Sequence, residues 1–174
     1  VFTVIGIILA AVFVAMVISI LLSIFIWNPL EVGCQKFFIN CKYGNAELGD
    51  IAYGFKNGYA HIGMIMFLRG LFTGLWMLLF IIPGIVKSYE YMMIPYLLAE
   101  HPEMTRQEAF AESKQMMDGN KWDAFVLDLS FIGWTLLGVC TFGILLVFYV
   151  EPYIYLTRAE LYHALKNNNK SVEF

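Results

Sequence analysis

Residues 1–27 read VFTVIGIILAAVFVAMVISILLSIFIW and contain no charged side chain. An uncharged apolar run of 18 or more residues is long enough, as a helix, to cross the roughly 30 Å hydrocarbon core of a bilayer. The stretch lacks the basic n-region and the short apolar h-region of a signal peptide. We therefore predict a true spanning helix, and we expect that residues ahead of Val1 have been lost.

The composition extends this prediction to the whole chain. Of the 174 residues, 60% are hydrophobic and only 14% are charged, whereas a soluble domain carries about a quarter of its residues as charged ones. A second long uncharged run covers residues 129–150. The net charge of −3 and the lack of a basic tract argue against nucleic acid as a partner. The sequence thus predicts one all-helical, polytopic membrane domain.

Turn signals divide the chain into about five spans. The predicted spans are 1–27, 60–82, 85–99, 122–141 and 144–164, with turns at Pro83-Gly84 and at Gly143. Similar motifs follow Trp76 and Trp134, so we predict two pseudo-repeated helical hairpins, although a chance match in an apolar alphabet is the alternative. The segment 85–99 is only about 22 Å long as a helix, so a re-entrant path is the alternative to a full crossing.

Three shorter amphipathic segments, 29–42, 47–56 and 105–117, are predicted to lie at the membrane surface. Asn28 before Pro29 is typical of a helix N-cap. In the segment that follows, Leu30, Cys34, Phe37, Phe38 and Cys41 share one helical face. Thr105 and Glu108 have the spacing of a capping box, which predicts the start of the third segment.

The basic residues predict the orientation. With both hairpins in place, eight of the eleven Lys and Arg residues lie on one side of the membrane. Because Lys and Arg accumulate in short cytoplasmic loops, we expect the surface helices and the C-terminus to be cytoplasmic.

Ordered motifs run through most of the chain: Asn28-Pro29-Leu30-Glu31, Gly54-Phe55, Leu68-Arg69-Gly70-Leu71-Phe72, Ile81-Ile82-Pro83-Gly84-Ile85, Ser113-x-x-Met116-Met117 and Pro152-Tyr153. From Asn28 to about Tyr162 the chain resembles the bacterial integral membrane family catalogued as domain of unknown function 975. The resemblance implies a multi-pass protein of the bacterial plasma membrane, chiefly in Gram-positive species, and it implies no activity. Glu151 departs from the pattern, in which an apolar residue precedes the proline.

Charged residues within the spans are the main functional candidates. An unpaired charge at mid-membrane costs about 2.5 to 3.5 kcal/mol, so such residues pair or line a wet cavity. Arg69, Asp128 and Arg158 are predicted to form a buried polar cluster, with Asp128 and Arg158 as partners. The structural alternative is one ion pair that fixes helix packing, plus a snorkelling arginine. Secondary candidates are Lys87 and Glu90, predicted as a solvated pair near the outer interface, and Glu151. Pro83, Gly84, Gly143 and Pro152 are the predicted hinge or turn positions.

The sequence contains no motif for a metal or a cofactor. None of the three histidines is followed by a second metal ligand three or four residues later, and there is no C-x-x-C, G-x-S-x-G, H-E-x-x-H, G-x-G-x-x-G or Walker loop. We therefore expect neither metal nor cofactor.

These features favour a non-enzymatic accessory, binding or carrier component that handles a lipid or a hydrophobic peptide. The alternatives are a membrane-embedded enzyme acting on lipid phosphate headgroups, with Arg69 and Arg158 as anion clamps and Asp128 as base, and a small transporter or pore. The expected partners are membrane lipids and another membrane protein or a second copy of the chain.

Overall fold

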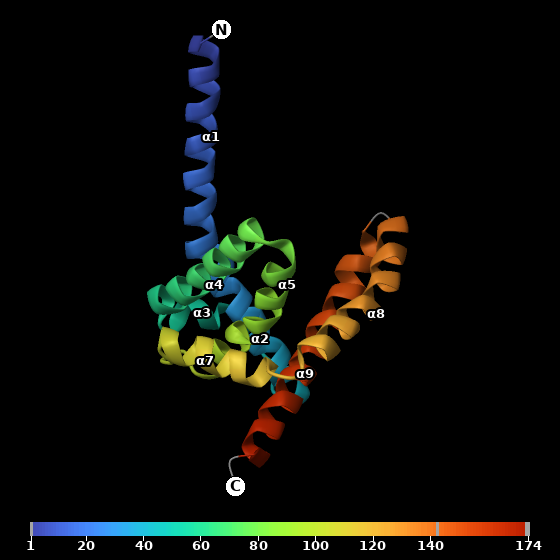
Figure 1. Cartoon of the computed structure of the whole chain (residues 1–174). Coiled ribbons are helices and arrows are strands. Elements are labelled where there is room, and N and C mark those ends of the chain that lie inside the picture. The colour runs from blue at the N-terminus through green and yellow to red at the C-terminus, as the bar shows by residue number, and fades with distance from the viewer. Residues whose placement is uncertain (1, 142, 173–174) are drawn as a thin grey trace.

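The computed structural model describes residues 2–141 and 143–172, so Val1, Phe142 and the last two residues lie outside it. Every element within these ranges is helical, which confirms the predicted all-helical class (Figure 1). The helices are α1 Phe2–Leu22, α2 Asn28–Lys42, α3 Tyr53–Lys56, α4 Tyr59–Leu79, α5 Ile81–Glu90, α6 Ile94–Glu100, α7 Arg106–Met117, α8 Lys121–Cys140 and α9 Glu151–Val172. Two π-helical turns, Ser23–Trp27 and Leu146–Val150, and a 3-10 helix, Leu48–Ala52, complete them.

Three helices are long and apolar enough to cross a membrane. They are the continuous helix Ile5–Lys42, α4 and α8. Figure 1 shows α1 standing clear of the other helices, and its large apolar side chains, such as Leu9 and Phe13, are about two-thirds exposed. Side chains this apolar are stable in such an exposed position only where a lipid or another helix covers them.

The first helix does not end at Asn28. Asn28 has helical dihedral angles (φ −64°, ψ −49°), so the predicted N-cap at this residue is wrong. The π-helical turn before it accommodates Pro29, which has no N–H to donate to the carbonyl of Phe25 four residues earlier. That carbonyl instead accepts a hydrogen bond of 2.7 Å from the Tyr59 hydroxyl. The chain therefore bends here without breaking.

The helix α2 is central to the fold, whereas the sequence predicted that this segment lies at the membrane surface. It packs against the 3-10 helix Leu48–Ala52 and against α3, α4, α6 and α9. The most buried face contains Val32, Gln35 and Ile39, while the predicted apolar stripe through Cys34 and Phe38 is only partly buried. Gly33 and Gly54 allow this packing, because a Cβ at Gly33 would lie 1.9 Å from the Ile51 carbonyl oxygen and one at Gly54 would lie 2.2 Å from that of Pro29.

The first hairpin turns earlier than predicted. Phe80 is extended (φ −152°, ψ 126°) and joins α4 to α5, while Pro83 and Gly84 lie inside the first turn of α5. At Gly84 a Cβ would come within 2.6 Å of the Met77 Cα, so the two arms of the hairpin touch. The return arm is not one helix over 85–99, because turns at residues 91–93 separate α5 from α6. With Pro95 in its first turn, α6 begins where the proline blocks continuation of α5.

The second hairpin has a different return arm. Gly143 adopts φ +82° after α8, which agrees with the predicted turn. The chain is then helical from residue 144 to residue 172, with a π-helical turn just before Glu151 and Pro152. Pro152 therefore lies within a bent but continuous helix and not at a break between two helices.

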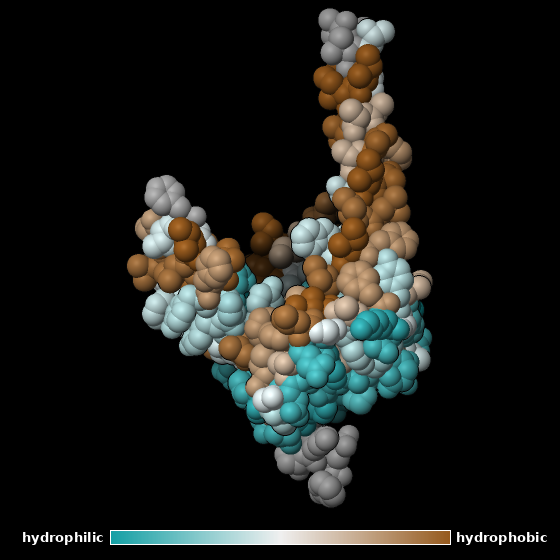
Figure 2. Space-filling view, turned by 180° about the vertical axis from the view of Figure 1, so that it is seen from behind, coloured by the Kyte–Doolittle hydropathy of each residue, from teal (hydrophilic) through white to brown (hydrophobic). Residues whose placement is uncertain are grey.

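The hydrophobic core lies at the end of the molecule away from α1 and the hairpin turns. All of α6 except Glu100 is buried, and it packs against α2, α4 and α7. Tyr96 of α6 stacks on Tyr162 of α9, with ring centroids 5.5 Å apart. Figure 2 shows hydrophobic residues on α1 and toward the hairpin turns, and hydrophilic residues over the opposite end. We call this opposite end the polar end.

A helix forms over most of the third predicted segment, 105–117. Thr105 accepts a hydrogen bond from the backbone N–H of Glu108, whose carboxylate accepts one of 2.8 Å from the backbone N–H of Thr105. This reciprocal capping box starts α7 at Arg106.

The carboxylate of Glu100 ties α6 to α9. It accepts hydrogen bonds from the Tyr162 hydroxyl, at 2.5 Å, and from Lys166. Burial raises the pKa of Glu100, but the bonds from Lys166 and Tyr162 and the charge of Lys166 lower it more, so the pKa lies below its ordinary value of 4.5. Such a carboxyl stabilises the folded state above its ordinary pKa, and the contribution is lost as the pH falls through the lowered value.

We therefore expect Glu100→Gln to lower the free energy of unfolding at neutral pH by about 1 to 3 kcal/mol. The unfolding midpoints of the wild type and the variant should converge as the pH is lowered from about 6 to about 3. Glu103→Gln, at a carboxylate that is largely exposed, is the control and should show no such convergence. A constant difference between wild type and Glu100→Gln across this range would contradict the assignment.

Candidate functional site

Arg69 lies in the middle of α4 and is held by two partners. Its Nη1 lies 2.9 Å from Glu31 Oε1 in α2. Its Nε donates a hydrogen bond of 3.0 Å to the carbonyl of Tyr91. That carbonyl is four residues before Pro95, which cannot donate a helical hydrogen bond to it. Arg69 is therefore neutralised by Glu31 and also replaces a backbone donor that Pro95 lacks.

Asp128 and Arg158 form the second ion pair, between α8 and α9. Arg158 Nη2 lies 2.9 Å from Asp128 Oδ1, and the Tyr89 hydroxyl donates a 3.0 Å hydrogen bond to Asp128 Oδ2. The Nε of Arg158 is buried and has no hydrogen-bond partner among the residues that the structure describes. Both carboxylate oxygens of Asp128 are thus occupied, and α5, α8 and α9 are linked through one side chain.

The two ion pairs are separate but lie near one buried residue, Tyr96. Its side chain is 2% exposed, and within the described ranges its hydroxyl has no hydrogen-bond partner. The charges of Arg158, Glu31 and Arg69 all act on this hydroxyl. The structure therefore brings Asp128 and Arg158 together and pairs Arg69 with a residue outside the predicted cluster.

Lys87 and Glu90 are not the solvated outer pair that the sequence predicted. Lys87 Nζ lies 2.7 Å from Glu90 Oε2, but the Glu90 side chain is only 3% exposed. Lys114 of α7 and Lys121 of α8 approach the same carboxylate at 3.8 and 3.7 Å. The pair was misplaced because α5 is short, so Glu90 reaches α7 and the start of α8 at the polar end. We call Lys87, Lys114 and Lys121 the lysine cluster.

An apolar groove runs between α5 and α8 and ends at this lysine cluster. Its volume is about 370 Å³, which is within the range of about 300 to 1,000 Å³ typical of ligand pockets. The groove is lined by Ile82, Ile85, Val86, Tyr89, Lys121, Trp122 and Phe125. The rings of Tyr89 and Phe125 meet edge to face, with centroids 6.2 Å apart. Figure 1 shows α5 and α8 converging toward the polar end and diverging toward their hairpin turns.

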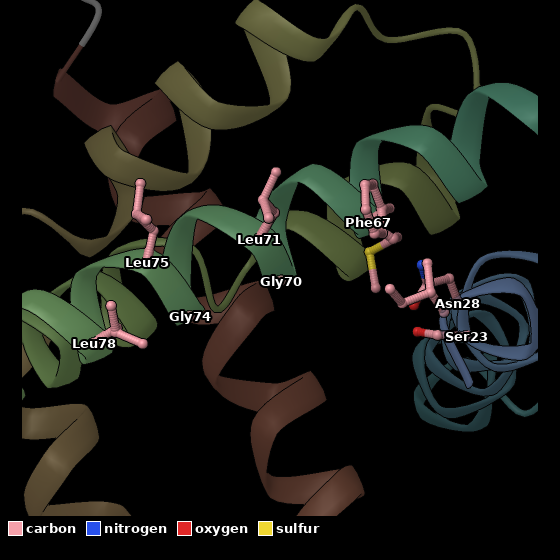
Figure 3. Close-up of a pocket in the computed structure, with 10 residues that line it drawn as sticks. Ser23, Asn28, Phe67, Gly70, Leu71, Gly74, Leu75 and Leu78 are labelled. Carbon is pink, nitrogen blue, oxygen red and sulfur yellow. The ribbon is translucent and has the colours of Figure 1, made fainter. Parts of the chain in front are cut away.

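A second groove, of about 470 Å³, follows α4 where it faces the bend between α1 and α2. Figure 3 shows Gly70, Leu71, Gly74 and Leu75 along α4, with Ser23 and Asn28 at one end. The Asn28 amide already donates to the carbonyl of Gly63, at 3.4 Å. Since no charged side chain lines this groove, it offers less basis for selecting a ligand than the α5–α8 groove does.

The remaining candidates have structural surroundings. Glu151 is exposed at the start of α9, where its charge acts on Tyr155. The described ranges contain no group of three or more His, Cys, Asp or Glu side chains that could hold a metal ion.

Sequence reasoning missed Glu31 and the convergence of Lys114 and Lys121 on Glu90. Glu31 lies within the amphipathic segment 29–42, for which the sequence predicts a position at the membrane surface. The sequence does hold a signal for its role, since Arg69 needs a counterion and Glu31 begins the helix that follows the first span. The lysine cluster joins three helices, and no spacing within the sequence indicates it.

A family model described as "Protein of unknown function (DUF975)" matches residues 3–169 of the chain. It is the same family that the ordered sequence motifs resemble. No curated protein and no solved structure matches the chain.

Proposed function

The chain belongs to the DUF975 family of proteins of unknown function, and we propose that it is a multi-pass integral membrane protein that binds a lipid without transforming it. The observation that carries this proposal is the apolar groove between α5 and α8, in which Lys121 is the one charged side chain among the described lining residues. An acyl chain fits such a groove, because it is apolar along its length and enters from the hydrocarbon region.

We place the polar end of the molecule at the cytoplasmic face of a bacterial plasma membrane. The segregation of hydrophobic and hydrophilic residues in Figure 2 supports this orientation, as does the gathering of basic residues in the segments between the spans. In this arrangement α1 crosses the bilayer and the two hairpins enter from the cytoplasmic side. The ten residues of α5 rise only about 15 Å, about half of the hydrocarbon core, which supports a re-entrant first hairpin over the alternative of a full crossing.

The pairing of the interior charges favours binding over catalysis. A carboxylate that serves as general base needs access to the proton that it removes. Asp128 is instead occupied by Arg158 and by the Tyr89 hydroxyl. Arg69 is likewise occupied by Glu31 and the Tyr91 carbonyl. Side chains held in this way fix the packing of the helices, and neither Asp128 nor Arg69 is free to act as the base or the anion clamp of an enzyme acting on lipid phosphates.

Filling the groove tests the proposal. Val86 lines the groove and is 44% exposed, so a tryptophan there should occupy the space without disturbing the core. We expect Val86→Trp to reduce the lipid bound to the detergent-solubilised chain about tenfold or more, which corresponds to about 1.4 kcal/mol. Native mass spectrometry of the chain with added phospholipid measures the bound fraction.

Ile132→Trp is the matched control, because Ile132 is 51% exposed on α8 and lies outside the lining of the groove. It should leave lipid binding unchanged. Equal lipid occupancy in Val86→Trp and wild type would refute a binding role for the groove. Formation of a chemically altered lipid during the incubation would refute the non-enzymatic assignment.

A further inference from the structure

We propose that the α5–α8 groove selects an anionic phospholipid, whose phosphate binds between Lys114 and Lys121 while one acyl chain follows α5; this inference rests on the proposed function above. The starting observation is an excess of positive charge where the groove ends. Three lysines surround the single carboxylate of Glu90, which leaves the site with a formal charge of +2 (three minus one).

The three lysines differ in their distance from the Glu90 carboxylate. Lys87 lies 2.7 Å from Glu90, and its Nζ also lies 5.9 Å from the centroid of the Trp76 ring. Lys114 and Lys121 lie 3.8 and 3.7 Å from the carboxylate, beyond hydrogen-bond distance. Lys87 therefore neutralises Glu90, and the other two lysines keep ammonium donors for an anion.

The position of Lys121 connects this charge to the groove. Lys121 is itself a lining residue, next to Trp122, at the first turn of α8. From there the apolar wall of α5 runs from Tyr89 to Ile82, a rise of about 10 Å, toward the hairpin turn. A ligand that satisfies both parts must carry a negative charge at one end and an apolar chain at the other, which describes an anionic phospholipid with its headgroup at the cytoplasmic interface.

Two acidic residues close in sequence to the lysine cluster, Asp123 and Glu112, do not share a helix face with its lysines. Asp123 is two residues from Lys121 and therefore lies on the other side of α8. Glu112 is two residues before Lys114 and therefore lies on another side of α7, where its charge acts on Tyr162 of α9.

The test compares phosphatidylglycerol with phosphatidylcholine of the same acyl chains, both titrated onto the full chain in detergent and followed by native mass spectrometry. A lysine near an anionic membrane surface contributes about 1 kcal/mol, so two lysines predict a preference for phosphatidylglycerol of about 30-fold. The double variant Lys114→Gln/Lys121→Gln should lose most of this preference. Lys56→Gln/Arg106→Gln removes the same charge from exposed positions elsewhere at the polar end and should retain it.

The charge-preserving variant Lys114→Arg/Lys121→Arg should restore the preference for phosphatidylglycerol. It therefore distinguishes a loss of positive charge from a loss of fold. If the lysine-to-glutamine variant unfolds, the wild type, the arginine variant and the control still decide the proposal. Equal binding of the two lipids by the wild type would overturn it, as would an unchanged preference in a folded glutamine variant. If Val86→Trp lowers the binding of both lipids while the lysines have no effect, only the headgroup assignment fails. If Val86→Trp has no effect, the proposed function itself fails.

Discussion

Asp128→Leu is expected to destabilise the folded chain by about 3 to 5 kcal/mol. The variant leaves the Arg158 guanidinium without its carboxylate partner, and the Nε of Arg158 already has no hydrogen-bond partner in the described part of the chain. It also removes the acceptor of the hydrogen bond from the Tyr89 hydroxyl. A buried charge that loses its partner is costly, whereas replacing both members of a buried pair by apolar residues is often nearly neutral. The double variant Asp128→Leu/Arg158→Leu should therefore recover most of the stability.

The measurement is a double-mutant cycle on unfolding midpoints in a titration with a denaturing detergent. Asp123→Leu is the control, because Asp123 is exposed in the first turn of α8, and it should cost less than about 1 kcal/mol. If the single and double variants are equally unstable, the ion pair does not account for the loss. If Asp128→Leu retains full stability, the pair has no structural role.

Gly33→Ala is expected to have the second large effect, a loss of about 3 kcal/mol or more. The added Cβ would lie 1.9 Å from the oxygen and 2.7 Å from the carbon of the Ile51 carbonyl. These are backbone atoms, so no side-chain rotation relieves the clash, and α2 must separate from the 3-10 helix Leu48–Ala52. We expect little monodisperse protein by size-exclusion chromatography, and a lowered unfolding midpoint for any protein recovered.

Gly133→Ala is the matched control within a helix, because a Cβ there meets no other atom within 4 Å. It should be neutral or stabilising by up to about 1 kcal/mol, since alanine favours a helix more than glycine does. Wild-type stability of Gly33→Ala would show that α2 and the 3-10 helix do not pack as closely as described.

Local signals in the sequence were reliable where neighbouring residues settle the structure. The capping box at Thr105 and Glu108 starts α7, and Gly143 turns the second hairpin. The error at Asn28 has a physical cause. A proline is compatible both with the start of a helix and with a continuous helix that bends. Which of the two forms depends on whether another segment donates a hydrogen bond to the carbonyl oxygen that the proline leaves without a donor. At Phe25 the donor is Tyr59, 34 residues further along the chain.

The sequence was also insufficient to identify the partner of every charged residue. Asp128 and Arg158 were matched by their similar depth in adjacent spans, and the structure joins them at 2.9 Å. Arg69 was predicted to belong to the same cluster, whereas the structure pairs it with Glu31 of α2. Glu90 was assigned to the wrong end of the hairpin, because the first turn and the break at residues 91–93 shorten α5.

The sequence by itself determined that this chain is all-helical and that it contains uncharged apolar runs long enough to cross a membrane, whereas the structure reduces the five predicted spans to three helices of sufficient length within the described residues. Those properties depend on uncharged runs and on backbone hydrogen bonds within each helix, which neighbouring residues are sufficient to define. The tertiary structure alone decided which helices converge, and with them the α5–α8 groove, the lysine cluster around Glu90 and the pairing of Arg69 with Glu31. Such contacts join residues 24 to 38 positions apart, and their energy depends on the close approach of side chains that no local pattern specifies.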